Sequence, residues 1–216
     1  MTFRGVAASL LLVAFSLDPS SAGADDAPVI PPDELVYCTV CHGVQMKGNP
    51  NIEAPRLSGM DVDYIERQLL AFKNGWRGMH ESDTAGMEMR PMAAILEERE
   101  IAVAARYVNS VNSELPPTTI EGNAARGEAL YTSCAACHGT RAEGVAALGG
   151  PALSGLNDWY LVTQLVNFRN GTRGSHPEDT YGAQMRAAAS VLPDDAAIRD
   201  VVSYISTLQS RQGNKR

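Results

Sequence analysis

Two short segments of the chain place two cysteines and a histidine at the same spacing. The first reads YCTVCHG over residues 37–43, and the second reads SCAACHG over residues 133–139. The four cysteines of the chain all lie in these motifs: Cys38, Cys41, Cys134 and Cys137. A cysteine pair of this spacing can be a redox dithiol, part of a zinc site or the attachment point of a c-type haem.

The rest of the sequence favours haem. A thioredoxin-like dithiol belongs to a βαβ pattern, and the chain shows no convincing strand alternation. A zinc site would need two more ligands near each motif, and the remaining histidines are only His80 and His176. Two thiols one helical turn apart can each add to a porphyrin vinyl group, which aims the next residue at the iron. We therefore expect two covalently bound haem c groups, with His42 and His138 as iron ligands.

The two motifs belong to a longer internal repeat. A shift of 96 residues aligns residues 38–96 with residues 134–192 without a gap, with 25 identities in 59 positions. The pattern Y-x3-Q-L-x2-F-x-N-G-x-R-G-x-H recurs from Tyr64 and from Tyr160. The chain therefore contains one domain duplicated.

The repeat also selects the second iron ligands. Met185 is the only methionine after Met92, and its repeat partner is Met89. Both Met89 and Met185 lie 47 residues after the histidine of their own motif. Met87 and Met92 compete for the first iron, but neither has a methionine at its second-copy position. The equal spacing favours Met89 and Met185, and His/Met ligation raises the potential of a haem, as suits an electron carrier.

Two other repeated pairs could serve the haems. His80 and His176 would make bis-histidine haems if they lay over the irons, but we favour surface or propionate-neighbouring positions for them after the Asn-Gly turn. Arg77 and Arg173 could bind haem propionates, since a guanidinium fork pairs well with carboxylates. The alternative for both arginines is a solvated side chain.

The elements that must position these residues have helical patterns. Residues 61–75 and 157–171 carry Tyr, Leu and Phe at near-helical spacing, and each stretch ends in Asn-Gly. Residues 123–134 also have helical spacing, whereas residues 28–38 contain a Pro-Pro pair that should leave only a short stub.

Each copy closes with an amphipathic helix. In the second copy, Asp194 and Asp195 stand at the helix N-terminus, where the helix dipole favours acids. The apolar stripe of this helix consists of Ile198, Val201, Val202, Ile205 and Leu208.

The chain divides into a leader and two domains. Residues 1–24 have one basic residue, a short apolar run and an A-x-A site, which predicts a signal peptide cleaved near Ala24 and export to the periplasm. The apolar run has about ten residues, fewer than the roughly 20 that a membrane span needs. We expect domains at residues 25–114 and 115–216, joined by a Pro-rich linker, and no transmembrane segment.

Charge differs between the two domains. Residues 25–114 carry 15 acidic and 8 basic side chains, a net charge of −7, whereas residues 115–216 carry 9 of each. Such asymmetry bears on docking and steering. No basic patch is present, so the sequence argues against nucleic-acid binding.

These motifs resemble the dihaem cytochrome c4 family over essentially the whole mature chain. The resemblance implies an all-α fold, with two tandem class I cytochrome c-like domains related by a pseudo-twofold axis. It implies His42 and His138 as proximal ligands and Met89 and Met185 as distal ones. By the same resemblance, the carbonyls at or before the prolines of the "APRLSG" and "GPALSG" segments would orient the histidine rings. The short first helix departs from the pattern, and Met92 could compete for the first iron.

The resemblance implies a periplasmic electron carrier between redox proteins, namely a respiratory oxidase, a quinol-oxidising complex or a dehydrogenase. Such a carrier could be free or peripherally associated with the membrane. A second hypothesis is a dedicated haem subunit of a dehydrogenase or oxidase, with the acidic first domain as its docking face. A third, which we favour less, is a dihaem enzyme such as a peroxidase or a thiosulfate-oxidising enzyme, because an enzyme would need an open iron position.

Overall fold

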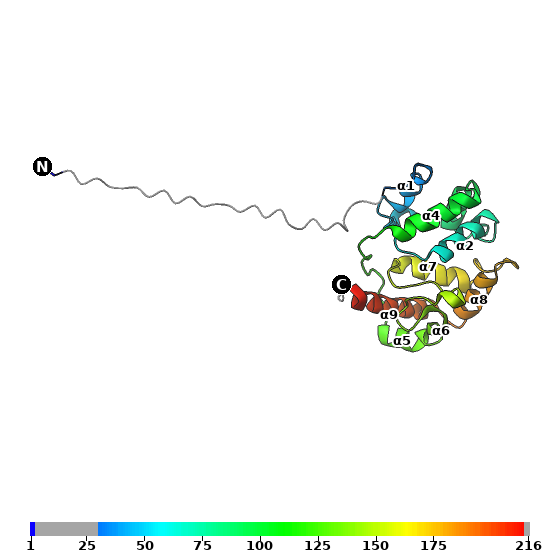
Figure 1. The fold of residues 1–216 in the computed structure, drawn as a ribbon. Helices are drawn as coiled ribbons and strands as arrows, with labels where there is room; N and C mark the ends of the chain where they lie inside the picture. Colours follow the sequence, from blue (N-terminus) through cyan, green and yellow to red (C-terminus); the bar gives the residue numbers. More distant parts are fainter. Residues whose placement is uncertain (3–29, 214–216) are drawn as a thin grey trace.

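The computed structural model describes residues 1–2 and 30–213 (Figure 1). Nearly all of the expected signal peptide therefore lies outside the described residues. Within the described part the regular structure is helical, apart from two isolated β-bridges, Asn49–Ala54 and Val145–Gly150. The all-α prediction is confirmed. Among these residues, no helix combines the length and hydrophobicity that crossing a membrane requires.

The helices follow the repeat. The first copy contains η1 (Asp33–Leu35), α1 (Cys38–His42), η2 (Pro50–Ile52), α2 (Val62–Lys73), α3 (Thr84–Ala94) and α4 (Glu98–Ser110), where η marks a 3-10 helix. The second copy contains α5 (Ala124–Tyr131), α6 (Ala135–His138), η3 (Ala146–Leu148), α7 (Asp158–Arg169), α8 (Thr180–Ala189) and α9 (Asp195–Gly213).

The two copies differ most at their first helix. Helix α5 begins at the cap residue Asn123, whose side chain accepts a hydrogen bond from the Arg126 amide (3.1 Å), and it packs against α9. In the first copy the corresponding segment is the single turn η1, directly after Pro31 and Pro32. Proline removes an amide donor and fixes φ, so the predicted stub is confirmed.

Helix α9 supplies much of the apolar core of the second copy. The side chains of its predicted stripe are all buried, with 0–6% of their surface exposed: Ile198, Val201, Val202, Ile205 and Leu208. Asp194 caps this helix, because its carboxylate accepts a hydrogen bond from the Ala197 amide (2.7 Å). The stripe packs with Tyr131 of α5 in the same apolar cluster.

Helices α2 and α7 face each other between the two lobes of the molecule (Figure 1). On its other side, α2 contacts α3 and α4, and α7 contacts α8 and α9. Residues 111–123, which connect the lobes, contain no regular element, as expected of a linker. The boundary between residues 114 and 115 stays a prediction.

Buried Arg56 of the first lobe forms hydrogen bonds with the second lobe through both its backbone amide and its guanidinium. The Arg56 amide donates to Asn157 Oδ1 (2.7 Å). Its guanidinium donates to the carbonyl oxygens of Gly155 (3.2 Å) and Ser113 (3.0 Å). Only 7% of Arg56 is exposed, so this contact between the lobes is shielded from bulk solvent.

Two candidate haem sites

Each cysteine motif forms a short helix beside a cavity. Cys38 and Cys134 are half-buried, whereas Cys41 and Cys137 are exposed, and none is in a disulfide. Burial raises the pKa of Cys38 to about 11 and also raises the pKa of Cys134. A redox dithiol needs a thiol with a lowered pKa. These thiols are therefore poorly suited to disulfide exchange, which agrees with the haem interpretation.

Each motif histidine is fixed by one backbone oxygen. The ring atom Nδ1 of His42 lies 2.8 Å from the Pro55 carbonyl oxygen, and that of His138 lies 2.8 Å from the Pro151 carbonyl oxygen. A carbonyl oxygen only accepts, so Nδ1 carries the proton and Nε2 keeps its lone pair. Burial also lowers the pKa of both histidines. Both rings are therefore neutral and able to bind a metal through Nε2.

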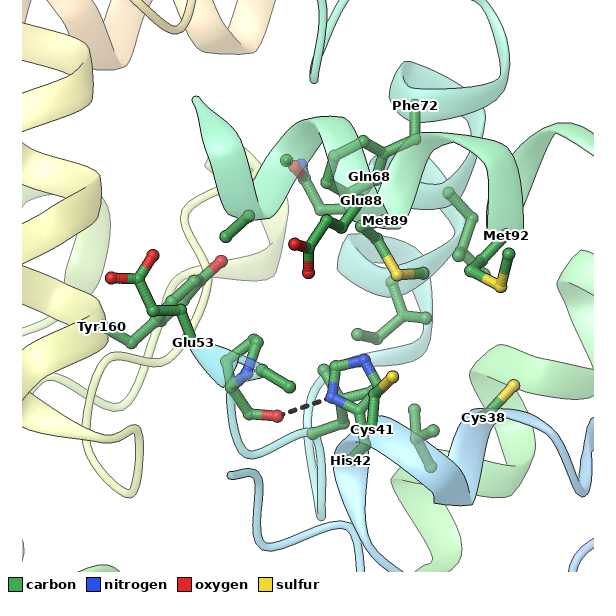
Figure 2. A pocket seen from close by; sticks show the side chains of 18 of the residues that line it. Cys38, Cys41, His42, Glu53, Gln68, Phe72, Glu88, Met89, Met92 and Tyr160 are labelled. Atoms are coloured by element: carbon green, nitrogen blue, oxygen red, sulfur yellow. Dashed lines mark hydrogen bonds between the residues drawn. The ribbon is translucent and has the colours of Figure 1, made fainter. Parts of the chain in front are cut away.

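The first cavity brings the candidate ligands to opposite sides. In Figure 2, Met89 comes from α3 above the cavity and its sulfur faces the ring of His42 below. The sulfur atoms of Cys38 and Cys41 lie along the lower edge of the same cavity (Figure 2). Much of the remaining wall is apolar, with Leu35, Met60, Ile65, Leu69, Phe72 and Leu96 among its side chains.

The two methionines that compete with Met89 for the first iron, Met87 and Met92, lie in different places. Met92 lines the first cavity with Met89, whereas Met87 does not line it and is exposed. Met185 lines the second cavity together with His138. Of the two methionines that compete with Met89 in the sequence, only Met92 therefore lies at the first site.

Neither His80 nor His176 lines either of these two cavities. His80 is exposed, and its Nδ1 accepts a hydrogen bond from the Ser82 amide (3.1 Å). The ring of His176 stacks on Trp76 across the domain interface, with ring centroids 5.9 Å apart. This arrangement gives no support to bis-histidine coordination.

The residues present fit a haem at each cavity. Each cavity has a thiol pair at its edge, a neutral imidazole nitrogen, a methionine and apolar walls. Each also has a buried arginine: Arg77 lines the first cavity and Arg173 the second. Haem has an apolar macrocycle and anionic propionates, which match the apolar walls and the cations.

The structure adds four residues to which the sequence analysis gave no role. Tyr64 and Gln68 of α2 line both cavities, and so do Tyr160 and Gln164 of α7. Their sequence signal was the repeated Y-x3-Q-L pattern. The pattern shows that these positions recur, but it does not show that they lie between the sites.

Comparison with known proteins agrees with this assignment. The family model for cytochrome c matches residues 36–112 and again residues 124–209. Cytochrome c4 of Pseudomonas aeruginosa is 31% identical over 188 residues, which cover 81% of this chain and 85% of that protein. A thiosulfate dehydrogenase electron acceptor of Stutzerimonas stutzeri is 29% identical over 186 residues, covering 81% of this chain and 80% of that protein.

Comparison with solved structures also agrees with the cytochrome c assignment. The solved structure of cytochrome c4 from Acidithiobacillus ferrooxidans matches with a TM-score of 0.62 and 28% identity, over 79% of this chain and 98% of that chain. The chain therefore belongs to the cytochrome c family, as a two-domain relative of the cytochromes c4 that carries two haem c groups and transfers electrons.

Proposed function

We propose that this chain carries electrons between respiratory redox proteins in the periplasm, by outer-sphere transfer. His42 and Met89 bind the first haem iron, and His138 and Met185 bind the second. The observation that carries the proposal is the placement of a neutral imidazole and a methionine around each cavity, at equivalent positions of the repeat. The predicted signal peptide and the cytochrome c4 relatives support the periplasmic location.

Outer-sphere transfer follows from the chain's own residues. Haem c would supply a one-electron iron couple, and one histidine and one methionine at each cavity would hold its iron, so no site on the iron would remain for a substrate. Apolar walls exclude water around the iron-binding side chains. Cys41 and Cys137 lie at the surface, so the cysteine edge of each cavity is open to a partner protein.

Ligand binding to the holoprotein tests this account. If both axial positions are filled, the wild-type protein does not bind carbon monoxide and shows a sulfur-to-iron charge-transfer band from both haems. The Met185→Ala variant should bind carbon monoxide at one haem and lose about half of the band. Met87→Ala is the matched control and should behave as wild type, because Met87 lines neither cavity. Carbon monoxide binding to the wild type would instead favour a haem enzyme.

One comparison favours a second candidate, a dedicated haem subunit of a dehydrogenase. The Stutzerimonas stutzeri relative is named as the electron acceptor of thiosulfate dehydrogenase. In this case the acidic first domain, with a net charge of −7 over residues 25–114, would form the docking face. A fixed-stoichiometry complex that survives size-exclusion chromatography at physiological salt would support the subunit, and elution as a free protein would support the mobile carrier.

A further inference from the structure

The two cavities reach the surface through equivalent positions of the repeat. The residues that both line the first cavity and are exposed, which we call the first mouth, are Cys41, Ile52, Glu53, Glu88 and Met92. The equivalent residues of the second copy also line its cavity, and we call them the second mouth: Cys137, Leu148, Gly149, Gln184 and Ala188. The two mouths can therefore be compared position by position.

The first mouth combines apolar and acidic side chains. Ile52 is 42% exposed and Met92 is 40% exposed, and Val40 of the adjoining cysteine motif is 78% exposed. Glu53 and Glu88 add two carboxylates at the same cavity (Figure 2). Neither carboxylate forms an ion pair with a cation among the described residues. The opening thus offers apolar contact area together with negative charge that the chain itself does not neutralise.

The second mouth has a different chemistry. Gly149 and Gln184 stand where the first mouth has its two glutamates, and none of the exposed residues that line the second cavity carries a carboxylate. A cation lies there instead. The guanidinium of Arg67 donates to the Gly149 carbonyl oxygen (2.9 Å) and lies 4.6 Å from the ring of Tyr181. A cationic surface is therefore attracted to the first mouth and repelled by Arg67 at the second.

We propose that the first mouth, together with Val40, is the docking surface for a redox protein whose contact face carries Lys and Arg side chains around an apolar centre. The inference rests on the proposed electron-carrier function and assigns such a partner to one of the two haem sites. Charge complementarity supports this occupant, because the two carboxylates lie in a domain with a net charge of −7. The same charge opposes a second copy of this chain at the mouth.

Paramagnetic mapping of the holoprotein locates the docking surface. Tris(1,10-phenanthroline)chromium(III) is a paramagnetic, redox-inert trication with apolar aromatic faces, so it imitates the chemistry of the partner. At low ionic strength it should broaden the NMR resonances of the first haem's methyl groups more than those of the second, because attraction is strongest at the first mouth. Equal broadening at the two haems, or stronger broadening at the second, would overturn the proposal.

The residues of the second mouth provide the substitutions that test the two carboxylates. The double variant Glu53→Gly, Glu88→Gln should fold, because the φ of Glu53 is +52°, where glycine fits without strain. At low ionic strength, its oxidation by tris(1,10-phenanthroline)cobalt(III) should slow at least about fivefold, since two charges no longer attract the trication. The matched control Glu81→Gln, Glu98→Gln removes the same charge from exposed residues that line neither cavity. This control should slow the reaction less than about twofold.

Oxidation by ferricyanide separates docking from a change in haem potential. Loss of the two carboxylates should accelerate oxidation by this anion, whereas a raised haem potential would slow both oxidants. Slowing with both oxidants, or equal effects of the two double variants on the cobalt reaction, would overturn the proposal. Failure of the proposed function would appear separately, as carbon monoxide binding by the wild type, while the chromium probe would still bind at the first mouth.

A matched pair of single variants tests the apolar part of the surface. Val40→Lys places a cation beside the first mouth and should weaken the broadening of the first haem's resonances and slow oxidation by the cobalt complex. Ala136→Lys makes the equivalent change in the second copy and should leave both readouts near the wild type. Equal effects of the two variants would contradict docking at the first mouth. Dimerisation of the wild type that Val40→Lys abolishes would assign the surface to a second copy of the chain and also contradict the proposal.

Discussion

At the scale of single residues, the second haem motif depends on a glycine where the first has an alanine. Gly150 is the repeat partner of Ala54 and lies against the backbone of the cysteine motif. A Cβ atom at Gly150 would lie 1.9 Å from the Cys137 carbonyl oxygen, far inside contact distance. The two motifs therefore have the same sequence pattern, but the first accommodates a Cβ atom at Ala54 whereas the second has no room for one at Gly150.

We expect Gly150→Ala to destabilise the second domain by about 1–3 kcal/mol, the usual cost of overpacking. Urea unfolding of the holoprotein, followed at the haem absorption, measures this loss. The reverse change at the first motif, Ala54→Gly, removes one methyl group and should cost less. Wild-type stability in Gly150→Ala would show that the Cys137 backbone moves freely, contrary to our account.

At the scale of the elements, the helices that carry Met89 and Met185 begin at an aspartate cap. Asp83 accepts from the Gly86 amide at the start of α3, and Asp179 accepts from the Gly182 amide (2.8 Å) at the start of α8. A capped first turn fixes where the helix begins. It therefore fixes the position of the methionine six residues after the cap.

Removal of the second cap should weaken the second site. We expect Asp179→Ala to cost about 1 kcal/mol of stability in thermal or urea unfolding, because the Gly182 amide loses its acceptor. Asp179→Asn is the control and should keep nearly the wild-type stability, since asparagine caps about equally well. Equal losses in the two variants would mean that the carboxylate charge, rather than the capping bond, is what matters.

At the scale of the whole molecule, the two domains meet at an interface that buries Arg56, Arg77 and Arg173, but they differ in net charge. The first domain has a net charge of −7 over residues 25–114, whereas the net charge of residues 115–216 is zero. This distribution should attract a positively charged redox partner to the first domain. Gln68 and Gln164, which line both cavities, lie between the first haem site and the second.

The charge difference predicts opposite salt dependences for small oxidants. Oxidation of the reduced protein by tris(1,10-phenanthroline)cobalt(III), a cation, should slow as ionic strength rises, because salt screens its attraction to the acidic domain. Oxidation by ferricyanide, an anion, should accelerate. Stopped-flow rates between low and physiological salt would check both trends, and equal trends for the two oxidants would contradict steering by the first domain.

Much of this architecture could be predicted from sequence because the repeat fixes residue identities. The cysteine motifs, the Met89–Met185 pair and the stripe of α9 all follow from spacing. Helices α3 and α8 could not be anticipated from apolar periodicity, and Pro91 lies inside α3. The position of Gln68 and Gln164 between the two cavities could not be predicted for a different reason. A repeat shows which positions are equivalent but not how the two copies pack.

The most direct test of the central claim is a redox titration of the wild-type holoprotein beside Met89→Ala, Met185→Ala and Met92→Ala. We predict two high-potential steps in the wild type, and loss of one step in each of the Met89 and Met185 variants, because methionine ligation raises the haem potential. Met92→Ala should keep both steps. Retention of both high-potential steps in Met89→Ala, or loss of one in Met92→Ala, would contradict the account.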